Sequence, residues 1–206
     1  MGKDICWNQT PGGLFFPEER AIHQLVCFRE RYHFADGVLA IYEYPADDDG
    51  SPIREKGRCL MCGPNLIVNS GRAATRALNS DTADGGVAAG VFDLGYLAVG
   101  VGSGGGAVSP LPGDIALATE STDPVAGPVV SGVPRPLMSV TTPPPGPPFM
   151  TNLWTGQIGA TDLNGLSIDE AGIFCLDDST LFCYRTFAAQ AKSAGFVMEF
   201  RWSIIF

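Results

Sequence analysis

The chain has 206 residues and a net charge of −9, and only 17% of its residues are charged. Proteins that bind nucleic-acid phosphates usually carry a basic surface. Lysine and arginine gather here only at Arg29, Arg31 and the stretch 54–58, so we predict no nucleic-acid partner. No apolar run is long enough to cross a membrane, so no membrane contact is predicted either. The 26 glycines and 16 prolines favour short strands joined by turns over long helices.

Residues 1–20 show little periodic pattern, although they contain three large aromatic residues, Trp7, Phe15 and Phe16. Such side chains contribute most when they are buried against another surface. We therefore predict an N-terminal arm that contacts a neighbouring subunit. The alternative is that this segment folds back on its own domain, as loops usually do.

Residues 21–64 fit a β-meander of three strands. The strands are predicted at Leu25–Phe34, Val38–Tyr44 and Ile53–Met61. The turns are predicted at 35–37 and 47–50, since Asp-Gly is a strong hairpin signal.

Residues 65–206 are predicted to form the main β-sandwich core. Ser70 is placed as the cap of a short helix from Gly71 to Leu78. A strand at Phe92–Val99 is predicted to lead into a glycine-rich loop at Gly100–Gly106.

Prolines make 121–150 the least regular part of the chain, because they remove backbone donors and favour extended conformation. Val129–Val140 is predicted to hold one interrupted strand, and Thr142–Pro148 a surface loop or arm. An extended pattern resumes at Asn152–Ala160.

The last forty residues carry the clearest strand pattern. Strands are predicted at Ala171–Leu176 and Leu181–Phe187, joined by a turn at Asp177–Thr180, and at Phe196–Phe206. In the last strand large apolar residues alternate with Val197, Glu199, Arg201 and other residues, and a period of two is typical of a half-buried strand. Glu199 and Arg201 are expected to pair weakly on its polar face. The predicted core residues are Phe174, Phe187, Phe196, Phe200, Trp202 and Ile204.

Together these elements predict an all-β protein. We expect an antiparallel, jelly-roll-like β-sandwich with an N-terminal meander, one short helix and long loops rich in glycine and proline.

Six cysteines include one C-x-x-C pair, Cys59 and Cys62. Zinc sites use this spacing, but a structural site wants two further ligands, and the candidates are the scattered Cys6, Cys27, His23 and His33. Met1–Cys6 lacks the apolar core of a secretion signal, so free thiols are expected. Cys175 and Cys183 lie on facing predicted strands, and their register decides whether they can bridge. We predict no metal site.

Other motif-like stretches favour structural interpretations. Gly100–Gly105 satisfies G-x-G-x-x-G, but Pro110 and Pro112 follow where a phosphate-binding helix must start. A calcium-binding loop that started at Asp47 would have Arg58 at its twelfth position, where an acidic ligand is needed, so a solvated turn is favoured. Neither histidine lies in a known catalytic context, and Asp169 and Glu170 form an acidic pair at the start of the predicted hairpin. We predict no catalytic residue, no cofactor and no enzymatic activity.

An ordered series of segments resembles a group of tailed-bacteriophage virion proteins. The segments are Asn65-Leu66-Ile67-Val68-Asn69-Ser70-Gly71-Arg72, the glycine loop 97–104, Ala116-Leu117-Ala118-Thr119-Glu120, Glu170-Ala171-Gly172-Ile173-Phe174, Tyr184-Arg185-Thr186-Phe187, Lys192 and Trp202-Ser203-Ile204-Ile205-Phe206. The group includes capsid decoration (cement) proteins and related tail-fibre and baseplate proteins.

The resemblance implies a structural role in the virion. It also implies a structural role for Glu170, because the glutamate of the E-A-G segment belongs to the shared fold pattern of these proteins. We expect a head decoration protein that binds the major capsid protein on the outer capsid surface and is assembled in the host cytoplasm. A homotrimer would match the local three-fold positions of a capsid lattice. The alternatives are a tail-fibre or baseplate protein and a virion-surface glycan-binding module, in which Trp154 or Trp7 stacks on sugars.

Overall fold

The computed structural model describes residues 36–73, 94–102, 109–123, 125–141, 151–176 and 180–205. Several predicted elements lie outside these residues: the arm with Trp7, Phe15 and Phe16, the strand 25–34, the loop 142–148, residues 177–179 of the predicted turn, Phe206 and most of the glycine loop.

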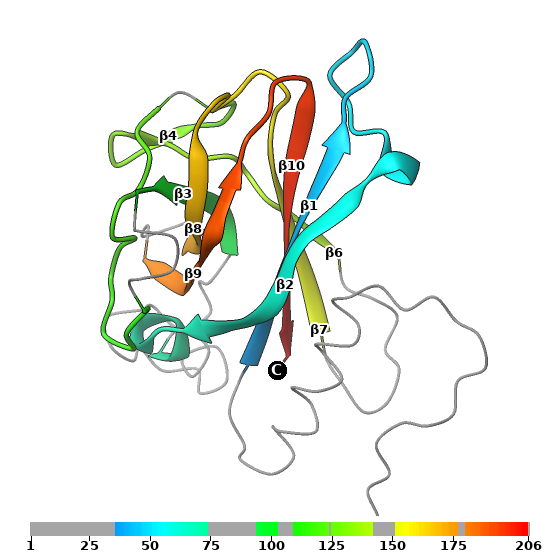
Figure 1. The fold of residues 1–206 in the computed structure, drawn as a ribbon. Helices are drawn as coiled ribbons and strands as arrows, with labels where there is room; N and C mark the ends of the chain where they lie inside the picture. Colours follow the sequence, from blue (N-terminus) through cyan, green and yellow to red (C-terminus); the bar gives the residue numbers. More distant parts are fainter. Residues whose placement is uncertain are drawn as a thin grey trace, which may run out of the picture.

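The described residues form ten strands. They are β1 (Asp36–Pro45), β2 (Arg58–Ile67), β3 (Leu94–Val101), β4 (Val129–Val130), β5 (Val133–Pro134), β6 (Ser139–Thr141), β7 (Thr151–Ile158), β8 (Ser167–Cys175), β9 (Leu181–Ala191) and β10 (Phe196–Ile205) (Figure 1).

Eight strands form one antiparallel sheet in the order β3-β8-β9-β2-β1-β10-β7-β6. The sheet curls until its ends nearly meet, since Leu97 N–H donates to Pro136 O (2.9 Å) and Met138 N–H donates to Gly95 O (2.7 Å). The all-β prediction is confirmed. The two facing layers expected of a sandwich belong here to a single, nearly closed sheet.

Strand β2 connects the two layers (Figure 1). Residues 58–65 pair with β1, while Leu66 and Ile67 pair with Tyr184 and Cys183 of β9. The domain boundary predicted between residues 64 and 65 therefore falls inside one strand. The described part of the predicted meander shares its sheet with the rest of the chain.

The main core fills the inside of the curled sheet, and β10 contributes its inward-facing side. On the neighbouring strand β1, Leu39 lies opposite Trp202 and Ile41 opposite Phe200. Burial of such side chains stabilises the fold by about 1.5–3 kcal/mol each. Phe196 is only half-buried, because it begins the strand opposite Pro45, at the edge of the core. The other inward-facing β10 residues are fully buried: Met198, Phe200, Trp202 and Ile204.

A second apolar cluster lies on the other face of β8 and β9. Leu117, from the segment 109–123, packs there with Phe174 and Tyr184. Phe187 is buried in the main core instead. Both sides of this half of the sheet are therefore covered.

The boundaries of two predicted elements are wrong. The third predicted strand begins at Arg58 rather than Ile53, because Arg54–Lys56 forms a 3-10 turn, η1. A hydrogen bond from Arg54 to Glu199 of β10 holds this turn in place. Ser70 is not the helix cap: helical residues begin at Asn69, and the Ser70 hydroxyl donates to Leu181 O (2.6 Å).

Two further segments differ in detail from the prediction. The interrupted strand at Val129–Val140 consists of the hairpin β4–β5 and the separate strand β6. The acidic turn at 47–50 forms as predicted, with Asp47 Oδ1 accepting from Ser51 N (2.8 Å). Among the described residues, no helix is long and apolar enough to cross a membrane.

Candidate functional site

Glu199 lies on the outward face of β10, on the side opposite Trp202, yet its side chain is completely buried. The strand alternation predicts the outward direction but not the burial. Gln157 lies directly opposite it on β7, and the η1 turn reaches it through Arg54.

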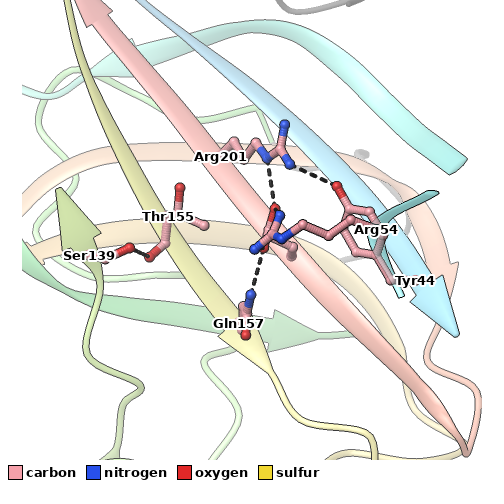
Figure 2. Close-up of polar contacts among 7 residues, drawn as sticks. Tyr44, Arg54, Ser139, Thr155, Gln157 and Arg201 are labelled. Carbon is pink, nitrogen blue, oxygen red and sulfur yellow. Dashed lines mark hydrogen bonds and ion pairs between the residues drawn. The ribbon is translucent and has the colours of Figure 1, made fainter. Parts of the chain in front are cut away.

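Four hydrogen bonds saturate the Glu199 carboxylate. Arg54 donates from Nη1 to Oε1 (3.0 Å) and from Nη2 to Oε2 (2.9 Å). Arg201 Nε donates to Oε1 (2.7 Å), and Gln157 Nε2 donates to Oε2 (2.6 Å). Arg201 also donates to the Tyr44 hydroxyl (2.8 Å), so the hydrogen bonds link side chains from four separate elements, β1, η1, β7 and β10 (Figure 2). We call Tyr44, Arg54, Gln157, Glu199 and Arg201 the Glu199 network.

The electrostatics of the network are dominated by its two guanidinium groups. Burial by itself raises the pKa of Glu199, but hydrogen bonds from Arg54, Gln157 and Arg201 outweigh it and hold the pKa below its usual range. The hydrogen bond to Glu199 in turn raises the pKa of Arg54. Both guanidinium groups donate to the same carboxylate. Arg54 is the more exposed of the two arginines, with 54% of its side chain exposed against 17% for Arg201.

An open groove of about 470 Å³ lies beside the network. Four of the described residues that line the groove are polar, and Figure 2 shows them on neighbouring elements: Arg54, Gln157, Thr155 and Ser139. The other described lining residues are apolar side chains and one glycine: Ala126, Gly127, Pro128, Pro136 and Leu137.

The C-x-x-C pair lies on the outward face of β2. The β1–β2 ladder has a bulge at Ile41 and Tyr42. Because of this bulge, the two neighbouring residues Leu60 and Met61 both pack on the main core. Cys59 and Cys62 pack instead on an outer cluster that contains Tyr42. Three residues of extended strand separate their Cα atoms by roughly 10 Å, and a disulfide needs less than about 7 Å.

No third metal-ligating side chain joins the pair among the described residues. The other candidate ligands, Cys6, Cys27, His23 and His33, lie outside those residues, so the absence of zinc stays a prediction. Cys175 and Cys183 are buried and do not form a disulfide, and Ile173 rather than Cys175 lies opposite Cys183. Burial raises the pKa of the Cys183 thiol.

Several of the segments that resemble virion proteins meet around Glu170, which is fully buried. Its carboxylate accepts hydrogen bonds from Ala118 N (3.1 Å), from Thr119 N (2.5 Å) and Oγ1 (2.7 Å), and from the Tyr184 hydroxyl (2.5 Å). Gly100 lies opposite Glu170 on β3, and a Cβ at this position would overlap the carboxylate. The carboxylate thus fastens the covering segment 109–123 to the sheet.

A buried ion pair completes this region. Arg135 donates from Nε to Glu120 Oε1 (2.7 Å) and from Nη2 to Oε2 (2.9 Å), and its guanidinium stacks on the Phe174 ring at 3.8 Å. Glu120 and Phe174 both belong to the resembling segments. In this chain the contacts of these motif residues are contacts of folding and packing.

Comparison with known proteins adds no relative: no family model, curated protein or solved structure matches the chain. Trp154, the aromatic residue expected to stack on sugars, is 6% exposed and packs in the main core, so it has no face to offer a ligand. Trp7 lies outside the described residues. Sequence reasoning missed Arg54 and Gln157, because neither belongs to a motif and both act through a partner distant in the sequence.

Proposed function

We propose that this chain is a non-enzymatic structural protein of a tailed-phage virion, a decoration protein on the outer surface of the head. It binds the major capsid protein and stabilises contacts between neighbouring capsomers. The ordered series of segments at Glu170, Tyr184 and Trp202 supports this proposal through its resemblance to such proteins.

The state of the buried carboxylates supports a structural rather than a catalytic role. Glu199 and Glu170 each accept four hydrogen bonds from the chain's own groups. A general acid or base needs a position that a substrate can reach. Both carboxylates instead join separate parts of one scaffold.

The observation that carries the proposal is the exposed apolar surface beside the groove. Leu137 lines the groove and is 60% exposed, and Val129, which follows the lining residue Pro128, is 69% exposed. Apolar side chains that border a formed depression are typical of a protein-binding surface. Many weak contacts of this kind, repeated over a shell, resist its expansion through multivalency.

The charge and symmetry of a capsid fit the same proposal. A chain of net charge −9 is repelled by the phosphates of a packaged genome and suits the outer surface. A homotrimer would place three copies around a local three-fold position of the lattice. The Glu199 network and groove belong to each protomer on its own, so every copy would present one docking surface.

A reconstitution experiment tests the proposal. Purified protein is added to phage heads assembled without it, and separately to isolated tails, and bound protein is measured after sedimentation. We expect saturable binding to heads and an increase in the temperature at which the heads rupture. Binding to tails alone would favour the tail-fibre or baseplate alternative and overturn the proposal.

A further inference from the structure

The groove beside Arg54 offers a ligand a positively charged group that has unused hydrogen-bond donors. Of the nine described residues that line the groove, Arg54 is the only charged one. A guanidinium has five N–H groups, and Arg54 gives two to Glu199, which leaves three for another acceptor. Asp162, which holds the lining residue Ala126, is not itself among the described lining residues, and its Oδ2 already accepts from Ala126 N (3.2 Å) and Gly159 N (3.3 Å).

The charge is also held in place before any ligand arrives. The two bonds to the fully buried Glu199 fix the Arg54 guanidinium in its plane, and its Cζ lies 5.6 Å from the centre of the Tyr44 ring. A fixed arginine loses less side-chain freedom on binding than a mobile one, which favours association.

The other described lining residues determine the rest of the ligand. Thr155 and Ser139 add hydroxyl groups to the lining, and Pro136 and Leu137 add aliphatic groups. A ligand that fits this lining carries an anionic group and an aliphatic group close together. None of the lining residues in the described part of the chain is aromatic, whereas sugar rings usually stack on aromatic side chains, so a protein segment fits better than a glycan.

We propose that this groove binds an aspartate or glutamate flanked by aliphatic residues on a surface segment of the partner protein. The acidic side chain pairs with Arg54 in the bidentate manner that guanidinium groups favour. The aliphatic neighbour packs on Leu137 and Pro136. This inference rests on the proposed function, which supplies a protein partner, and it adds the chemistry of the contact.

The probe is the tripeptide acetyl-Leu-Glu-Leu-amide, titrated into ¹⁵N-labelled full-length protein and followed by NMR. The backbone signals of Leu137, Thr155 and Gln157 should shift in a saturable way, with a Kd of about 1–10 mM, because a single contact of this size is weak. Acetyl-Leu-Gln-Leu-amide should bind at least about tenfold more weakly, and about 0.5 M NaCl should weaken the glutamate peptide several-fold. Equal binding of the two peptides, or tighter binding of glucuronate, would overturn the inference.

Two variants distinguish a loss of binding at the groove from a loss of folding. Leu137→Asp puts a negative charge into the groove, which repels an acidic ligand, and it replaces no residue of the Glu199 network. We expect at least about tenfold weaker binding of both the glutamate peptide and phage heads. Arg58→Gln is the matched control, since Arg58 is 72% exposed, pairs with Glu43 and does not line the groove. It should bind like the wild type.

The two proposals can fail separately. If heads bind wild-type protein and Leu137→Asp equally well, the groove inference is wrong while the decoration role stands. If the glutamate peptide binds the groove but heads do not bind the protein, the groove chemistry stands and its partner is not the capsid.

Discussion

Arg54 and Glu199 lie 145 positions apart in the sequence, and their side chains form a two-bonded ion pair with N–O distances of 3.0 and 2.9 Å. The pair fastens the η1 turn, which lies between β1 and β2, to the last strand of the sheet. Glu199 is completely buried while Arg54 is 54% exposed. Removal of Glu199 and removal of Arg54 should therefore lower the free energy of unfolding by different amounts.

Glu199→Gln should lower the free energy of unfolding by about 3 kcal/mol, because it leaves two guanidiniums without their common carboxylate. Arg54→Gln should cost about 1 kcal/mol, since a half-exposed arginine is largely solvated in either state and Arg201 and Gln157 still bind the carboxylate. Urea unfolding of the two variants and the wild type measures both values. Equal costs would contradict the view that the buried carboxylate is the centre of the network.

Acid should weaken the wild type more than Glu199→Gln. The folded-state pKa of Glu199 lies below the unfolded value of about 4.5, so its stabilisation is complete above pH 4.5 and is lost as the pH falls through the folded pKa. Over that interval the wild type should lose up to about 1.4 kcal/mol per pH unit more than the variant. Parallel stability curves below pH 4.5 would exclude the depressed pKa.

Gly100→Ala should destabilise the protein by about 2 kcal/mol, because the added methyl group would displace the Glu170 carboxylate from its hydrogen bonds. Gly113→Ala, in the segment that this carboxylate holds, is the control. A Cβ at Gly113 meets no atom within 4 Å, so its effect should stay within about 0.5 kcal/mol. Thermal unfolding of both variants distinguishes a packing effect at Gly100 from a general glycine effect.

Trp202→Ala should cost about 3–5 kcal/mol as a truncation in the core, since Trp202 is completely buried and stacks on Phe200 with ring centres 6.1 Å apart. Truncation after Gly195 removes all of β10 and with it the neighbour of both β1 and β7, so it should abolish folding. The measurement is cooperative unfolding followed by circular dichroism. A truncated protein that stays soluble and unfolds cooperatively would refute this view of the core.

The sequence predicts the local part of the fold well. Strict alternation around Phe200 and Trp202 predicts the inward side of β10, and the Asp-Gly signal at Asp49 predicts the hairpin after β1, because both depend on neighbouring residues. The single curled sheet depends on which distant strands pair, and no local pattern encodes the ladder between β2 and β9.

The candidate site was less accessible to prediction for the same physical reason. Glu199 next to Arg201 on an alternating strand looks like a solvated pair, and only the η1 turn and β7 bring Arg54 and Gln157 over it. Local patterns predict a strand at Ile53, whereas the distant Glu199 selects a turn there. Burial of a charge through tertiary contacts leaves no periodic signal in the sequence.

We propose the outer surface of phage heads as the place of this protein, and cryo-electron microscopy of purified virions tests that location most directly. We expect density for the nearly closed eight-stranded sheet at regular positions over the whole capsid surface, grouped around local three-fold axes, with the Arg54 groove turned toward the major capsid protein. Density for this sheet at the tail alone, or its absence from the virion, would contradict the account.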